Sequence, residues 1–124
     1  MKSAISTTQA PAAIGPYSQA IEPAAQYTYQ PAAHRPRTGA FAEGGIKELT
    51  RQSLTNIKHI LEQAGLTMGN VVKTSVFLAD MNDFAEMNEV YAQFFEAPFP
   101  ARSAVAVKTL PKNARIEIEC IAVK

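Results

Sequence analysis

Residues 70–95, NVVKTSVFLADMNDFAEMNEVYAQFF, carry the clearest signal of secondary structure in the chain. They begin with a β-branched, apolar run from Asn70 to Ala79 that has few polar interruptions. Such a run predicts a central strand that is covered on both faces. After it, large apolar side chains recur at helical spacing and predict an amphipathic helix; they are Phe84, Met87, Tyr91, Phe94 and Phe95.

The ends of two predicted helices can be located from single residues. Asp83 precedes Glu86 by three positions, which is typical of a capping box at a helix start. The prolines at 98 and 100 end this second helix. An earlier helix is predicted from Ile46 to Gly65, because apolar residues recur at helical spacing and glycine is common just past a helix end.

The remaining segments predict strands and turns. Residues 10–45 are rich in proline and alanine, but they carry too many large apolar residues for a linker, so we expect turns and short strands there. Strands are predicted over 102–107 and 115–123, with a turn at 110–113. The order indicates an α+β fold in which two helices cover one face of a mixed sheet. The other face still carries apolar side chains, so we expect it to be buried against further copies of the chain.

Composition bounds the function. The 124 residues, 47% hydrophobic and 19% charged, predict a single globular domain over residues 1–124. A formal net charge of +1 gives no basic excess for binding nucleic acid. No run approaches the roughly 18 apolar residues of a membrane span, and the first residues lack the apolar stretch of a signal peptide. The single cysteine excludes an intrachain disulfide, and the expected location is the cytoplasm.

Arg102 is the first candidate for a binding residue. It shares a predicted strand face with Ala104 and Ala106, so its guanidinium can project over small side chains that leave room for a ligand. A planar guanidinium donates two parallel hydrogen bonds to a carboxylate, which makes it suited to clamp an acid. The alternative is a surface salt bridge at a strand start.

Glu117 and Glu119 are candidates for acid–base chemistry. They lie two apart on a predicted strand face that becomes apolar at Ile121 and Val123. Partial burial raises the pKa of a carboxyl, which is how a glutamate becomes a general acid or base near neutral pH. The alternative is a pair of solvated charges, or ion pairs with neighbouring cations.

Other chemistries find little support in the sequence. His34 and His59 are isolated from each other and from Cys120, so the usual spacing of a metal site is missing. There is no Gly-x-Ser-x-Gly turn and no phosphate-binding glycine loop; the pair at 44 and 45 indicates a loop that approaches a helix. Cys120 alternates with apolar residues as a small core residue does.

Five stretches occur together in one order over nearly the whole chain. They are Ala10–Gln19 (APAAIGPYSQ), Asn70–Leu78 (NVVKTSVFL) with Asp83-Phe84 and Asn88, Phe99–Ser103 (FPARS), Leu110-Pro111, and Ile116–Glu119 (IEIE). This combination resembles the Rid/YjgF family of reactive intermediate deaminases, which act on enamines and imines. The combination is far more specific than any one of the stretches.

The resemblance implies a fold, an assembly and an activity. The expected subunit is chorismate-mutase-like, and three copies form a homotrimer whose sheets make a central barrel, with active sites in the clefts between subunits. The family hydrolyses 2-imino acids such as 2-iminobutanoate and 2-iminopropanoate to 2-oxo acids and ammonia, with no metal, cofactor or covalent intermediate. By position, Arg102 is similar to the clamp for the substrate carboxylate and Glu117 to the group that activates water. Tyr17 is similar to the residue that closes the pocket, and Asn88 to one that braces it.

The sequence departs from the family in one segment. Between Tyr29 and Arg37 the family has a Thr-Ser-Gly-Gln strand end and a proline turn that help to line the site, whereas this chain reads QPAAHRP at 30–36. Codons for residues 30–36 can be chosen so that the next reading frame encodes a family-like segment. A local frame slip is therefore one hypothesis for this departure, and the gene sequence tests it. Ala104 also replaces a cysteine of several members, and we expect little effect from it.

Two hypotheses therefore compete. The first is an imine/enamine deaminase, which retention of Arg102 and Glu117 favours. The second is a catalytically impaired trimeric protein that binds or senses a small 2-oxo or 2-amino acid, which the altered segment at 30–36 favours. A ribonuclease or translation-inhibitor activity, reported for some relatives, gains no support from the near-neutral charge. The preferred imine and the pathway that supplies it are not encoded in any motif.

Overall fold

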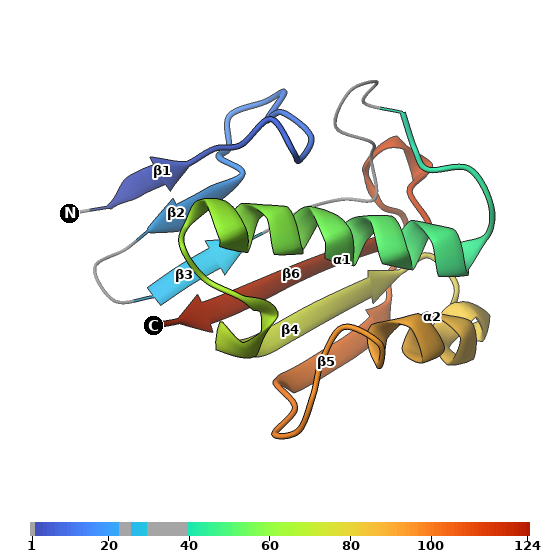
Figure 1. Cartoon of the computed structure of the whole chain (residues 1–124). Helices are drawn as coiled ribbons and strands as arrows, with labels where there is room; N and C mark the ends of the chain where they lie inside the picture. Colours follow the sequence, from blue (N-terminus) through green and yellow to red (C-terminus); the bar gives the residue numbers. More distant parts are fainter. Residues whose placement is uncertain (1, 23–25, 30–39) are drawn as a thin grey trace.

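Strands and helices separate into two layers, with both helices on one face of a mixed sheet (Figure 1). The computed structural model describes residues 2–22, the backbone of 26–29, and residues 40–124. The predicted α+β class is confirmed. The altered segment at 30–36, and with it His34, lies outside the described residues, so its arrangement stays a prediction.

The described strands form one six-stranded sheet in the order β1-β2-β3-β6-β4-β5. All neighbours are antiparallel except β4 and β5, which run parallel because a helix connects them. The strand bounds are β1 Ser3–Ile5, β2 Ala20–Glu22, β3 Gln26–Tyr29, β4 Val71–Leu78, β5 Ala101–Ala106 and β6 Ile116–Val123. The short strands expected within residues 10–45 are therefore confirmed for β2 and β3, whereas β1 precedes that segment and was not predicted. Strand β5 forms one edge of the sheet.

Helix α1, Ile46–Gln63, starts after Gly45, and Gly65 follows its C-terminal cap Ala64. The Gly45 backbone N–H donates to a Glu48 carboxylate oxygen at 2.8 Å, which satisfies a free donor at the helix start. Gly44 and Gly65 have φ of +111° and +77°, conformations that an L side chain disfavours. The predicted helix and its glycine stop are confirmed.

Helix α2, Phe84–Tyr91, is shorter than its apolar stripe and does not begin with the predicted capping box. A 3₁₀ turn, Met81–Asp83, precedes it, and the side chain of Asp80 accepts from the Asn82 N–H at 2.9 Å. Asp83 makes no side-chain cap; its carboxylate pairs instead with Arg115 at 3.1 Å. The capping-box prediction was wrong because Asp83 pairs with Arg115. Arg115 directly precedes β6 and is distant in sequence, so the residues around Asp83 do not reveal this pairing.

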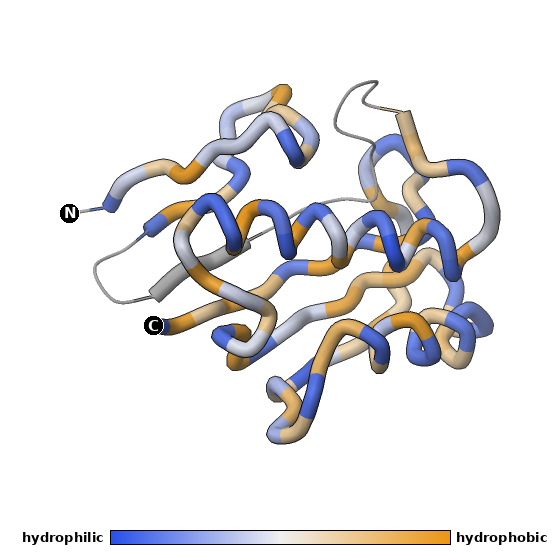
Figure 2. The backbone as a smooth tube through the Cα atoms, in the orientation of Figure 1, coloured by the Kyte–Doolittle hydropathy of each residue, from blue (hydrophilic) through white to orange (hydrophobic). Residues whose placement is uncertain are grey.

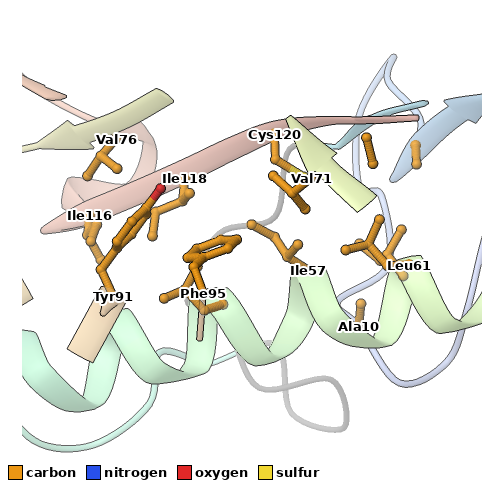
Figure 3. Packing of buried hydrophobic residues seen from close by; sticks show 14 of the residues in the cluster. Ala10, Ile57, Leu61, Val71, Val76, Tyr91, Phe95, Ile116, Ile118 and Cys120 are labelled. Carbon is orange, nitrogen blue, oxygen red and sulfur yellow. The ribbon is translucent and has the colours of Figure 1, made fainter. Parts of the chain in front are cut away.

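The core lies between the helices and the sheet (Figure 3). One face of β4 and β6 contributes alternate buried residues, and α1 contributes residues three or four apart. Figure 2 shows hydrophobic and hydrophilic residues alternating along α1, as expected of a helix with one buried face. The largest fully buried side chains include Leu54, Ile57, Leu61, Leu78, Met87 and Ile118.

The opposite side of the sheet, which we name the open face, lacks a helical cover among the described residues. Register places Glu117, Phe77 and Val105 in one row across it, and Glu119, Ser75 and Ser103 in the next. Phe77 is half-buried and Val105 is 45% exposed. Within one chain β4 is thus covered on a single face, so the expected burial of this face against other copies stays a prediction. No helix in the described part of the chain is long and apolar enough to cross a membrane.

Candidate functional site

Arg102 projects from the edge strand β5 toward the helices. Its register partner on β4 is Thr74, which is fully buried beneath the helical layer, and paired residues share a face of the sheet. Ala104 lies two positions on, on the same face, and packs against the core. The predicted floor of small side chains beside Arg102 is therefore present.

Helix α2 supplies three contacts that hold the guanidinium. Arg102 Nη1 donates to Asn88 Oδ1 at 2.7 Å. The guanidinium carbon lies 5.4 Å from the ring centre of Phe84 and 4.6 Å from that of Tyr91. Because residues 84, 88 and 91 are four and three apart, they share one face of the helix. We name these three residues the Arg102 cradle.

The cradle is made of neutral groups. Within the described chain, no carboxylate lies within 4.0 Å of the Arg102 side chain, in contrast to Lys47 and Arg115, which pair with Glu89 and Asp83. One Nη–H is used by Asn88, and the guanidinium keeps further N–H groups for another acceptor. The expected alternative, a salt bridge at the strand start, is absent from this part of the structure. The arrangement can bind a small carboxylate.

Glu117 lies on the open face of β6, beside Phe77 of β4. Burial raises the pKa of its carboxyl above the ordinary value, and the nearby charge of Glu119 raises it further. This is the predicted direction. The group can accept a proton from water nearer to neutral pH than an ordinary glutamate.

Tyr17 lies far from both groups in the same chain. It is 52% exposed and lines an open hollow of about 580 Å³ formed by the segment between β1 and β2, at the opposite edge of the sheet from β5 (Figure 1). Of the four predicted site residues, the structure therefore brings together only Arg102 and Asn88. Glu117 is on the other face, and Tyr17 is at the other edge.

The other chemical candidates have structural roles. His59 Nδ1 lies 3.0 Å from the Gln9 carbonyl oxygen and joins α1 to the N-terminal segment. Cys120 is buried and free, and burial strongly raises the pKa of its thiol, which leaves it unreactive. Among the described residues, no group of three His, Cys, Asp or Glu side chains is placed to hold a metal ion.

Comparison with known proteins identifies the family. The family model described as endoribonuclease L-PSP matches residues 7–124. The chain belongs to this family, also called YjgF/Rid. It is 50% identical over 121 residues to 2-iminobutanoate/2-iminopropanoate deaminase of Bos taurus, covering 97% of this chain and 88% of that one. It is 52% identical to a RutC family protein of Pyrococcus horikoshii, covering 100% and 99%. The crystal structure of Escherichia coli TdcF with bound serine superposes with a TM-score of 0.93 at 42% identity, covering 98% of both chains.

Two aromatic members of the cradle in this YjgF/Rid chain were not predicted as site residues. Phe84 and Tyr91 belong to the apolar stripe of α2, and their spacing alone indicates core packing. The signal that distinguishes them is Asn88, a polar residue that interrupts the stripe at the same helical face. A stripe that contains one amide beside two rings is suited to hold a cation.

Proposed function

We propose that this protein hydrolyses short 2-imino acids, such as 2-iminobutanoate and 2-iminopropanoate, to the 2-oxo acid and ammonia. The broader class, an imine/enamine deaminase, is that of curated relatives about 50% identical over nearly the whole chain. TdcF, of the same fold, holds the small amino acid serine. The proposed location is the cytoplasm, which suits the single free thiol.

One observation carries the proposal: the Arg102 guanidinium is held in place by neutral groups and retains free donors. A cation that lacks a carboxylate within the described chain is available to an acid from outside, and a charge-assisted hydrogen bond to a carboxylate contributes about 1.5–3 kcal/mol. A 2-imino acid has one such carboxylate. The near-neutral charge of the chain argues against the phosphate backbone of RNA as the ligand.

The proposed site is shared between copies of the chain. Arg102 and Glu117 lie on opposite faces of one sheet, because their register partners Thr74 and Phe77 are three positions apart on β4. A pocket that holds both groups can be built when the open face of one copy packs beside β5 of another. A homotrimer whose open faces form a central barrel supplies three such pockets and covers the half-buried apolar residues of that face.

The chemistry then needs little beyond positioning. Arg102 binds the carboxylate and fixes the imine carbon, which is already electrophilic. Glu117 accepts a proton from a water molecule as the water oxygen bonds to that carbon. The nitrogen receives this proton from Glu117, which gives the amino alcohol. Glu117 then passes the hydroxyl proton to the nitrogen, the C–N bond breaks, and the 2-oxo acid and ammonia are released. Orientation and one proton carrier are sufficient for such a step.

The test follows imine lifetime. Threonine dehydratase releases 2-iminobutanoate from threonine, and semicarbazide traps the imine that is left. Added protein should speed formation of 2-oxobutanoate and lower the trapped fraction. No acceleration by the assembled protein would favour the second hypothesis, a trimeric protein that binds a small 2-oxo or 2-amino acid without turnover.

Replacement of the clamp gives the matched control. Arg102→Ala removes the guanidinium from the edge strand, where it is partly exposed, so the fold and the assembly should survive. We expect kcat/KM to fall at least about 100-fold, since two charged hydrogen bonds are lost. Size-exclusion chromatography with light scattering checks the assembly. Turnover equal to that of the wild type would remove Arg102 from the site.

A further inference from the structure

Tyr91 occupies an unusual position for a core residue. It is 6% exposed, and its ring stacks against Phe95 with the ring centres 4.7 Å apart. The same ring carries the Arg102 guanidinium on its surface, with the guanidinium carbon 4.6 Å from the ring centre. One aromatic side chain thus joins the apolar core to the proposed carboxylate clamp.

The far end of the tyrosine is also fixed. Its hydroxyl lies 2.8 Å from the hydroxyl of Thr74, in a hydrogen bond that is buried. Thr74 is fully buried on β4 and is the register partner of Arg102 on β5. In Figure 3 the Tyr91 oxygen is directed from the helix side toward the sheet, near Val76 and Ile118. The strand next to Arg102 therefore sets the angle of the ring on which Arg102 rests.

The ring meets the guanidinium as a neutral phenol. Burial raises the pKa of the Tyr91 hydroxyl, against smaller opposing effects of the Thr74 hydrogen bond and the Arg102 charge. The side chain consequently offers a neutral aromatic surface to the cation, and such contacts are stronger where water is excluded. Asn88 fixes one Nη atom, and the ring fixes the plane of the guanidinium.

We propose that Tyr91 and Thr74 form a positioning pair for substrate binding, in which the ring of Tyr91 sets the plane of the Arg102 guanidinium and the hydroxyl of Thr74 holds that ring. The inference rests on the proposed function, since it assigns Arg102 to the substrate carboxylate. Neither residue touches substrate; both act through Arg102. Preorganisation of this kind lowers the ordering cost of binding.

The main variants separate the ring from the hydroxyl. Tyr91→Leu removes the aromatic surface, and we expect KM for 2-iminobutanoate and Kd for 2-oxobutanoate to rise about tenfold while kcat changes less than about twofold. Tyr91→Phe and Thr74→Val each remove the same hydrogen bond and keep the ring, so each should raise both constants about two- to threefold. Thr74→Ser retains a hydroxyl and should behave like the wild type.

Phe95→Leu is the matched control. Phe95 has the same 6% exposure as Tyr91 and packs on its ring, but in the described part of the chain the rings beneath the Arg102 guanidinium are those of Phe84 and Tyr91. It should lower stability as much as Tyr91→Leu does and leave KM and Kd within about twofold of the wild type. Equal rises of KM in Tyr91→Leu and Phe95→Leu would overturn the proposal, because a general loosening of the core would then explain both.

The binding measurement also separates the two proposals. If the wild type binds 2-oxobutanoate but does not speed imine loss, the proposed function fails while the positioning pair is judged on Kd alone. If the wild type binds 2-oxobutanoate with the same Kd as Tyr91→Leu and Thr74→Val, the positioning pair fails and deamination can stand. Absence of both binding and turnover in the wild type would overturn both proposals.

Discussion

Glu117 and Glu119 illustrate how one residue modifies another on a strand. Both point to the open face of β6, and the charge of Glu119 adds to burial in raising the pKa of the Glu117 carboxyl. A base must be ionised to accept a proton from water, so kcat/KM should rise with pH through the pKa of Glu117. The acidic limb of the pH profile therefore reports this residue.

Glu119→Gln tests that relation. Removing the negative charge lowers the pKa of Glu117, so the acidic limb of kcat/KM should move to lower pH, while burial keeps it above the limb of an ordinary glutamate. Glu62→Gln, at an exposed position on α1, is the control and should leave the limb in place. Uncatalysed imine hydrolysis is subtracted at each pH. A limb that stays fixed or moves upward in Glu119→Gln would contradict the assignment of Glu117 as the base.

The sequence alone predicts several features of individual residues in the candidate site. The alternation along residues 115–123 predicts the half-buried glutamate, and the alanines after Arg102 predict its small-residue floor. The same alternation does not reveal Tyr91 as a platform, because an aromatic residue at helical spacing has the same pattern whether it packs only on apolar groups or also beneath a cation. That distinction depends on which strand lies opposite the helix.

The ends of helices can be predicted from local sequence where the backbone conformation permits only one residue type. Gly65 has φ of +77°, and nothing lies within 4 Å of the position a Cβ would take, so the positive φ alone selects glycine there. The start of α2 shows the opposite case. Asp83 has the residue type and spacing of a cap, yet its carboxylate pairs with Arg115 across the fold. A capping pattern in the local sequence therefore does not form a cap when a charged side chain from elsewhere in the chain pairs with the capping residue.

Two glycine substitutions test the backbone argument with opposite signs. Gly65→Ala should lower the free energy of unfolding by about 1 kcal/mol, because alanine is strained at positive φ. Gly69 has no positive φ, and a Cβ added there would lie 3.4 Å from Thr67 Oγ1, an ordinary contact distance. Gly69→Ala should therefore leave the free energy of unfolding unchanged or raise it by about 0.5 kcal/mol, because alanine restricts the unfolded chain. Urea denaturation measures both. Equal effects at the two positions would contradict the role given to φ at Gly65.

A single copy of the chain lacks a complete site for the proposed reaction. Arg102 lies on the helix-covered face, Glu117 on the open face, and Tyr17 at the opposite edge of the sheet. Sequence patterns predict on which face of the sheet each residue lies. They therefore also predict that the face without helices is buried against another chain. They do not predict which copy supplies which group, because that depends on how separate chains pack.

Complementation between two inactive variants tests whether each site is shared between copies of the chain. Arg102→Ala and Glu117→Gln are co-expressed with different tags, and imine loss is measured on the mixed assembly with each single variant as the baseline. If each site takes Arg102 from one copy and Glu117 from its neighbour, half of the copies supply each group, and random mixing should restore about one quarter of wild-type activity. Mixed assemblies as inactive as either variant alone would contradict a site shared between copies.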